Sequence, residues 1–162
     1  MANYTVLVVD DEPMIRTLLH RAIATAEIDV VEADSAETAL QMVAPPAGFA
    51  LVVTDILLGR MDGVELAQKL SATGRGYRFL FISGYAEDQL IRNCIDQFQC
   101  ALFLEKPFAI SDLIHAVHYL LDSPSAGGLT ANIGGGRRSY LRHTAHPAIE
   151  TQNPCWESST VE

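Results

Sequence analysis

The sequence predicts an α/β fold in which a doubly wound parallel sheet is covered by helices on both faces. Two observations lead to this prediction. Short β-branched and aliphatic runs recur through the first 121 residues, and segments with helical apolar spacing lie between them. Strands and helices that alternate in this way form parallel sheets, and in such sheets the ligand site lies beyond the carboxyl ends of the strands.

Five apolar runs mark the buried strands, which are expected at Thr5–Val9, Val30–Ala33, Ala50–Thr54, Arg78–Ile82 and Ala101–Leu104. Apolar residues three and four apart mark a helix after each strand, and these helices contain Ile15, Ala36, Val64, Leu90 and Ile110. The fourth helical pattern is the weakest. Asp34 or Ser35 is expected to cap the second helix, and Ser111 with Asp112 marks the start of the last one.

The charge of the chain excludes one class of partner. The formal net charge is −9, with 8 bases and 16 acids up to residue 121 and 3 bases and 4 acids after it. Binding of a nucleic acid needs a basic surface that neutralises phosphates, so no nucleic-acid partner is expected. A surplus of carboxylates instead suits a divalent cation.

Cysteine usage and the N-terminal segment indicate a reducing, cytoplasmic location. Cys94, Cys100 and Cys155 form no CxxC pair, and their odd number argues against a closed set of disulfides. The apolar run at residues 6–9 follows no basic stretch and is far too short for a signal peptide or a membrane span. We therefore expect no membrane association.

The composition changes after Leu121. Ser-Pro-Ser-Ala-Gly-Gly comes first, Gly-Gly-Gly-Arg-Arg follows at residues 134–138, and no periodicity persists to the last residue. Such composition is typical of flexible segments. We expect one domain over residues 1–121 and a flexible, disordered tail over residues 122–162.

Acidic side chains follow two of the expected strands. Asp10, Asp11 and Glu12 come directly after the first strand, and Asp55 comes after the third. Carboxylates that converge at one edge of a sheet repel one another, and a hard cation with oxygen ligands relieves that repulsion. Mg²⁺ is the expected ion, and Mn²⁺ would suit the same oxygens.

Two further strand exits carry groups that can hold an anion. The fourth strand ends at Ser83-Gly84, which offers a hydroxyl and an unobstructed backbone N–H. The fifth ends at Lys106-Pro107, where an ammonium can pair with an anionic group. A cation, a hydroxyl, an amide and an ammonium would then surround Asp55.

In five separated motifs the sequence resembles two-component response-regulator receiver domains over residues 4–121, in particular single-domain receivers of the chemotaxis type. The motifs are Val8-Val9-Asp10-Asp11-Glu12, Thr54-Asp55-Ile56, Met61-Asp62-Gly63, Ile82-Ser83-Gly84 and Lys106-Pro107-Phe108. The resemblance implies a flavodoxin-like (βα)5 fold with a five-stranded parallel sheet in the order 2-1-3-4-5.

The resemblance also implies roles for the acidic residues and their neighbours. Asp55 would be the phosphoacceptor and also a metal ligand, Asp11 a direct metal ligand, and Asp10 an acidic partner of the metal that acts through water. The backbone carbonyl of Leu57 would complete the metal site.

The remaining motif residues would respond to the phosphoryl group. Ser83 and Lys106 would hold its oxygens, and Phe103 would change rotamer when Ser83 moves inward. The Lys106-Pro107 bond is expected to be cis, as in the family.

Some positions depart from the pattern of the family. Leu58 and Gly59 stand where receivers often carry Met-Pro, and Ser83-Gly84 replaces Thr-Ala, as in receivers attached to hybrid histidine kinases. Leu57 and Tyr85 flank the path of attacking water, and neither has a carboxylate or amide to orient it. We expect a phosphoryl lifetime longer than in receivers with polar residues at these two positions.

The function expected from these observations is that of a stand-alone response regulator. It would accept a phosphoryl group from a histidine kinase or a histidine phosphotransfer protein and catalyse only its own phosphorylation and dephosphorylation. Output would pass to a downstream protein through the helix 4/strand 5/helix 5 face, from a monomer or weak dimer.

Two alternatives stay open. The first is a receiver-like interaction module that works without phosphorylation. The second is an aspartyl-nucleophile phosphatase of the haloacid-dehalogenase kind, which is disfavoured because those enzymes place two aspartates one residue apart, whereas Asp10 and Asp11 are adjacent.

Overall fold

The computed structural model describes residues 4–44, 48–84, 93, 95–98, 100–123, 129–133 and 142–143 of the chain. Its centre is a set of five parallel strands in the order β2-β1-β3-β4-β5, so the predicted fold class is confirmed. The strands are β1 (Tyr4–Val9), β2 (Ile28–Ala33), β3 (Leu51–Asp55), β4 (Phe79–Ser83) and β5 (Cys100–Glu105).

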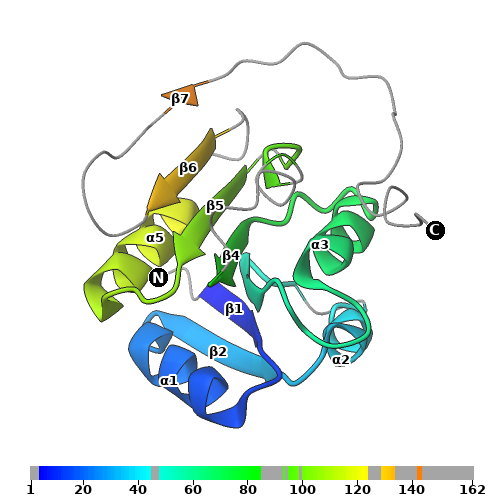
Figure 1. Ribbon diagram of the computed structural model, residues 1–162, viewed down its shortest axis with the longest axis horizontal. Coiled ribbons are helices and arrows are strands. Elements are labelled where there is room, and N and C mark those ends of the chain that lie inside the picture. Colours follow the sequence, from blue (N-terminus) through cyan, green and yellow to red (C-terminus); the bar gives the residue numbers. More distant parts are fainter. Residues whose placement is uncertain are drawn as a thin grey trace, which may run out of the picture.

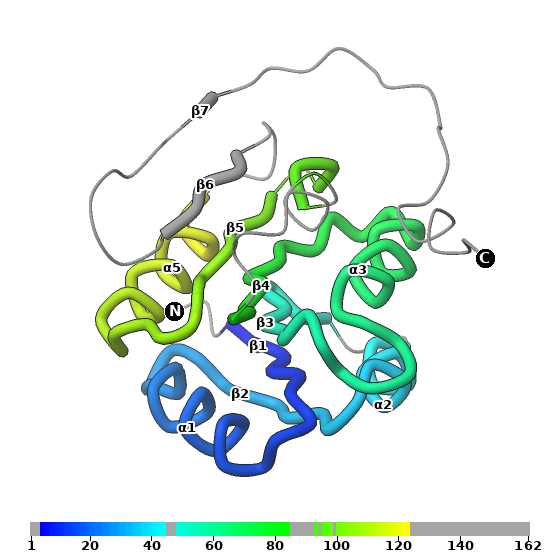
Figure 2. Tube along the Cα trace, viewed as in Figure 1, coloured from blue at the N-terminus to red at the C-terminus, as the bar shows by residue number. Residues whose placement is uncertain are grey.

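Helices cover both faces of this sheet, as Figure 1 shows. α1 and α5 lie on one face and α2 and α3 on the other, and Figure 2 traces the chain as it passes between the layers. Their bounds are α1 (Pro13–Ile23), α2 (Ala36–Met42), α3 (Gly63–Ser71) and α5 (Ile110–Asp122). The fourth predicted helix falls largely outside the described residues, although Asn93 and Ile95 are helical.

Local hydrogen bonds explain where two of the helices begin. Ser35 precedes α2, and its hydroxyl accepts a hydrogen bond from the backbone N–H of Thr38 at 3.1 Å, so the predicted cap is confirmed. α5 begins at Ile110, one residue before the Ser111 start signal. The carboxylate of Asp112 accepts a 3.4 Å hydrogen bond from the N–H of Ala109, so Asp112 contributes to this start.

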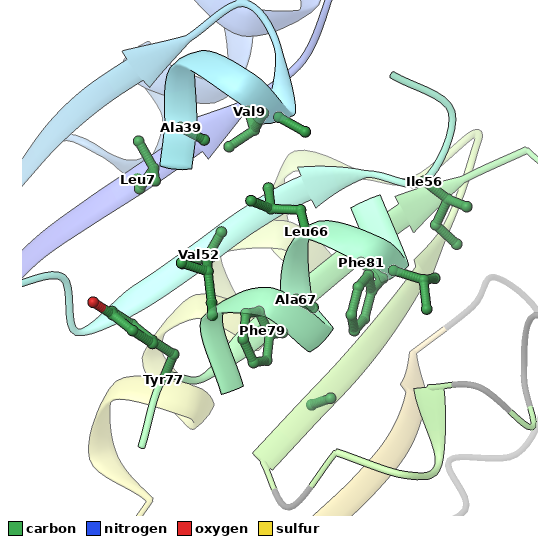
Figure 3. Packing of buried hydrophobic residues seen from close by; sticks show 14 of the residues in the cluster. Leu7, Val9, Ala39, Val52, Ile56, Leu66, Ala67, Tyr77, Phe79 and Phe81 are labelled. Atoms are coloured by element: carbon green, nitrogen blue, oxygen red, sulfur yellow. The ribbon is translucent and has the colours of Figure 1, made fainter. Parts of the chain in front are cut away.

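The core has two parts because alternate residues of each strand face opposite layers. In β4, Phe79 and Phe81 pack toward α2 and α3, whereas Leu80 and Ile82 pack toward α1 and α5. Figure 3 shows the first part, with Phe79 and Phe81 of the sheet beside Ala67 of α3. Burial on both faces accounts for the nearly continuous apolar runs of these strands.

The sheet continues beyond β5, which the sequence did not predict. β6 (Leu129–Ile133) pairs parallel to β5, and β7 (Arg142–His143) pairs antiparallel to β6, giving seven strands. A flexible tail was expected over residues 122–162, and residues 129–133 depart from that expectation. As an edge strand, β5 would have unpaired backbone N–H and C=O groups, and a five-residue segment without Gly or Pro can pair with them. A segment of five residues is too short to show the periodicity from which a strand is predicted.

Candidate functional site

The register of the parallel strands brings the predicted site residues to one edge of the sheet. Asp55, the last residue of β3, pairs with Ile82 of β4, so Ser83 is the next residue along β4. Ser83 pairs with Glu105, and Lys106 follows directly. Asp10 comes directly after β1, whose Val9 pairs with Thr54 of β3.

Asp55 and Lys106 form an ion pair at the centre of this edge. Lys106 Nζ donates to Asp55 Oδ2 at 2.5 Å, and the backbone N–H of Leu57 donates to Asp55 Oδ1 at 2.8 Å. Burial of Lys106 opposes its charge, but the hydrogen bond and the negative charge of Asp55 outweigh this effect and raise the pKa of Lys106. Lys106 is therefore an ammonium held against the predicted acceptor.

Asp10 is buried beside this pair and is less completely satisfied. Its Oδ1 accepts a hydrogen bond from the backbone N–H of Glu12 at 2.8 Å, whereas its Oδ2 is buried without a hydrogen-bond partner. Burial is the main cause that raises the pKa of Asp10 to about 6, and the negative charges of Asp55 and Asp11 raise it further. The hydrogen bond from the Glu12 amide and the positive charge of Lys106 lower this pKa, but they do not outweigh burial. One buried carboxylate oxygen of this edge thus lacks a hydrogen-bond donor.

The donor chemistry of the edge fits a divalent cation. Carboxylate and carbonyl oxygens are the ligands that Mg²⁺ prefers, and the buried, unpartnered Oδ2 of Asp10 is the kind of atom that a cation would satisfy. Among the described residues, however, no three Asp, Glu, His or Cys side chains are arranged as a ready metal site. Asp55 Oδ2 contacts Lys106 instead, Asp11 is exposed, and the fourth predicted ligand is the carbonyl of Leu57.

Ser83 and Phe103 lie on neighbouring strands, and both are buried. Ser83 is 1% exposed, and its carbonyl accepts a hydrogen bond from the backbone N–H of Lys106 at 2.9 Å. Phe103 pairs in register with Phe81, two residues before Ser83, and packs in the core on the α2 and α3 side. The ring of Phe103 is therefore in an inward position.

The loop after β3 explains one departure from the family pattern. Gly59 has a φ of 90°, a conformation that proline cannot adopt and that glycine adopts without strain. Leu58 is buried, and Leu57, two residues after Asp55, is 54% exposed. Tyr85, the other residue expected to affect phosphoryl lifetime, lies outside the described residues. The Lys106–Pro107 bond is cis, which confirms that prediction.

The amino end of α3 lies against the backbone at the end of β3, a contact that the sequence did not reveal. The N–H of Gly63 donates to the carbonyl of Ile56 at 2.8 Å, and the hydroxyl of Thr54 donates to the carbonyl of Asp55 at 2.8 Å. A Cβ at Gly63 would collide with the Asp55 carbonyl oxygen. The motif Met61-Asp62-Gly63 was recognised, but its contact with Asp55 requires the three-dimensional structure.

Five adjacent parallel strands in the order β2-β1-β3-β4-β5, with an aspartate–lysine ion pair and a second buried aspartate at their carboxyl ends, define a class of signalling receivers. The response regulator receiver domain model matches residues 6–118, and the chain belongs to this family. Receiver domains of two-component response regulators are phosphoryl-accepting signalling modules that interact with histidine kinases or phosphotransfer proteins, and the family generally binds Mg²⁺ at its acidic pocket.

Curated relatives contain the receiver in different settings. Sensor kinase CckA of Brucella abortus (strain 2308) is 36% identical over 73% of this chain, but the match spans 12% of CckA. Response regulator receiver protein CpdR of the same strain is 29% identical over 72% of this chain and 95% of CpdR. Response regulator MprA of Mycobacterium leprae (strain TN) is 30% identical over 72% of this chain and half of MprA.

Solved structures agree with this assignment. The receiver domain from hybrid histidine kinase CckA superimposes with a TM-score of 0.61 and 28% identity, covering 73% of this chain and 99% of that domain. A response regulator receiver protein from Sinorhizobium medicae WSM419 gives a TM-score of 0.66 and 29% identity, covering 75% of this chain and 96% of that protein. No helix in the described part of the chain is long and apolar enough to cross a membrane.

Proposed function

We propose that this chain is a phosphorylation switch that accepts a phosphoryl group on Asp55 from a histidine kinase or a phosphotransfer protein in the presence of Mg²⁺. The observation that supports the proposal most directly is the ammonium of Lys106, 2.5 Å from Asp55 Oδ2, beside the unpartnered Oδ2 of Asp10. Lys106 supplies one positive charge beside the buried carboxylate of Asp55, and the unpartnered oxygen of Asp10 offers a ligand for a second positive charge, that of the cation.

The contacts of Asp55 assign different roles to its two oxygens. The Leu57 amide holds Oδ1, so Oδ2 is the proposed nucleophile once Lys106 has moved from it to an incoming phosphoryl oxygen. A bond forms from Oδ2 to phosphorus while the bond from phosphorus to the phosphohistidine nitrogen breaks, and the electron pair of that bond stays on the imidazole. A bound cation would neutralise phosphoryl oxygens, with Asp11, Asp10 and the Leu57 carbonyl as its proposed partners.

The proposed output starts at Ser83. A phosphoryl oxygen would draw the hydroxyl of Ser83 toward Asp55, and Phe103 would change rotamer in response, shifting an existing equilibrium between two states. Because Phe103 belongs to β5, the change would reach the face formed by the fourth helix, β5 and α5. A downstream protein is proposed to bind there.

Exposed apolar side chains near the site support a protein as phosphodonor. Met14 is 84% exposed and Leu18 is 45% exposed, and they lie one turn apart on α1, which begins directly after the acidic residues. A helical surface of a kinase or phosphotransfer protein can cover such a pair while it presents its phosphohistidine. We also propose that the chain acts without an output domain of its own, as the near full-length match to CpdR suggests.

The test is the intact mass of the protein after incubation with a small phosphodonor, with and without Mg²⁺, for the wild type and Asp55→Asn. We expect a Mg²⁺-dependent gain of one phosphoryl group in the wild type and none in the variant, with circular dichroism showing the same fold. If the wild type gains nothing under any condition, the chain is a receiver-like module that binds partners without phosphorylation. A gain in Asp55→Asn would place the acceptor elsewhere.

A further inference from the structure

A chain of side-chain contacts leads from the outer strand of the sheet to the acidic residues after β1. Arg16 of α1 donates from Nη1 to the backbone carbonyl oxygen of Asp10 at 2.8 Å and from Nε to Glu32 Oε2 of β2 at 3.2 Å. His20 Nδ1 lies 2.6 Å from the other carboxylate oxygen of Glu32. The side chain of Arg16 is 17% exposed, so most of it is packed against the protein.

The carbonyl that Arg16 holds belongs to the peptide group that joins Asp10 to Asp11. The orientation of this group determines how the two acidic side chains are placed relative to each other. The N–H of Asp10 is already bound to the carbonyl of Ala33 at 3.2 Å, and the carbonyl of Glu12 accepts the N–H of Arg16 at 3.0 Å. The Arg16 side chain therefore holds the part of the loop that lies between these two anchors.

The shape of the guanidinium group suits this task. It is planar and always charged, and its Nε and Nη1 donors diverge toward two acceptors on different elements. A lysine would supply the charge but not the rigid pair of donors. Glu32 balances the charge of Arg16 and fixes its plane, while Arg16 bonds the backbone of Asp10 and leaves the carboxylate Oδ2 without a partner.

We propose that Arg16, held by Glu32, is a positioning residue that orients the Asp10–Asp11 peptide and so sets the affinity of the acidic pocket for a divalent cation. This inference rests on the proposed cation site. Groups that orient metal ligands without touching the metal typically change its affinity by about 10-fold to 100-fold when they are replaced. Arg16 acts here through the backbone of a ligand-bearing loop.

The direct test measures Mg²⁺ affinity of the full-length, unphosphorylated protein by titration calorimetry. We expect Arg16→Gln and Arg16→Lys each to weaken binding about tenfold, and Glu32→Gln to weaken it about threefold because Arg16 keeps its bond to Asp10 but loses its fixed plane. The matched control is Lys69→Gln, which removes the 3.5 Å ion pair with Glu65 on the exposed face of α3. Its Mg²⁺ affinity should equal that of the wild type.

A second readout separates positioning from a loss of stability. In Arg16→Gln, the Mg²⁺ concentration that gives half-maximal phosphorylation should rise about tenfold, while the rate at saturating Mg²⁺ stays near that of the wild type. If Arg16→Gln does not fold, Glu32→Gln carries the test, because it leaves Asp10 and Arg16 in place. In the double variant Arg16→Gln with Glu32→Gln, the loss of Mg²⁺ affinity should be smaller than the product of the two single losses, because both residues act through the contact of Arg16 with Asp10.

Three results would overturn the proposal. Wild-type Mg²⁺ affinity in both Arg16→Gln and Glu32→Gln would remove any positioning role, and full rescue by Arg16→Lys would show that charge and not the fork of donors is what counts. Absence of Mg²⁺ binding in the wild type would refute the cation site itself, and with it the proposed function. The same titration distinguishes this outcome from a failure of the Arg16 proposal alone, in which the wild type binds Mg²⁺ and the variants bind it equally well.

Discussion

The exits of β3 and β1 each carry a buried aspartate, but the two are satisfied to different degrees. Both carboxylate oxygens of Asp55 have donors, Lys106 and the Leu57 amide. Asp10 has the Glu12 amide on one oxygen, and its other oxygen is buried without a partner. Asp55 thus has a donor on each carboxylate oxygen, whereas the unpartnered carboxylate oxygen lies next to it, on Asp10.

This difference separates two tasks that a phosphoryl-accepting site must combine. Lys106 supplies a fixed positive charge beside the carboxylate of Asp55. A carboxylate that is costly to ionise without a counter-ion gives the pocket a reason to bind one. Two variants test this division of tasks directly: one removes the positive charge of Lys106, and the other removes the negative charge of Asp10.

Lys106→Ala is the variant with the largest expected effect because, among the residues that the structure describes, Lys106 is the side chain that forms an ion pair with Asp55. We expect phosphorylation to be slower by about two orders of magnitude, and the free energy of unfolding to fall by about 2 kcal/mol because Asp55 stays buried. Mg²⁺ binding by calorimetry should persist. NMR signals of Phe103 should no longer change on phosphorylation, and a retained change would contradict the role of Lys106.

Gly63→Ala would disturb the satisfied side through its backbone. A Cβ at this position has no room beside the Asp55 carbonyl, so α3 or the end of β3 must move, and overpacking of this kind costs about 2 to 3 kcal/mol. Chemical denaturation measures the loss. Gly48→Ala is the control because no atom lies within 4 Å of a Cβ there. Equal losses in the two variants would show that the contact with Asp55 is unimportant.

Asp10→Asn would remove the negative charge from the carboxylate that has an unpartnered oxygen at the end of β1. Asp10 has a folded-state pKa of about 6 against its ordinary 3.8, so the folded chain holds this proton more tightly than the unfolded chain does. Its contribution to the free energy of unfolding is therefore most favourable below about pH 4, falls as the pH rises to about 6, and stays low above that.

We accordingly expect metal-free Asp10→Asn to be about 2 kcal/mol more stable than the wild type near pH 7.5 and nearly equal to it near pH 4. Urea unfolding at the two pH values measures this. Saturating Mg²⁺ should stabilise the wild type more than the variant. A variant that is less stable than the wild type near pH 7.5 without metal would contradict the assignment of Asp10 as the unsatisfied carboxylate.

Leu57→Asn has the smallest expected effect and concerns what happens after phosphorylation. Leu57 is exposed beside the acceptor and cannot orient water, whereas an amide can, so we expect hydrolysis of the phosphoryl group to be faster by a factor of about five. The decay of phosphoprotein followed by intact mass gives the rate, with Leu57→Ile as the apolar control. A phosphoryl group that is long-lived only in Leu57→Asn would contradict the hypothesis.

The sequence was sufficient where a motif directly follows a buried strand. Parallel register alone then places Asp55, Ser83 and Lys106 at one edge, and apolar runs locate the strands to within one or two residues. The cap at Ser35 was also predictable because a helix start is decided by residues within a single turn. These features depend on local sequence and on one rule of topology.

The missed features depend on contacts between residues far apart in the chain. Arg16 meets Glu32 across sixteen positions, and nothing in either segment marks the other. The close approach of Gly63 to Asp55 depends on where α3 packs. The unpartnered oxygen of Asp10 depends on burial by several elements at once.

β6 alters how the sheet ends on the side of α5. Paired along Cys100–Leu104, β5 no longer presents a full row of open N–H and C=O groups to other molecules. The open backbone groups now belong to β6, a strand of five residues, and β7 pairs with two of those residues. A sheet that tapers in this way offers a poor template for edge-to-edge association between copies of the chain. Residues 129–133 thereby cover the backbone edge of the strand that carries Phe103.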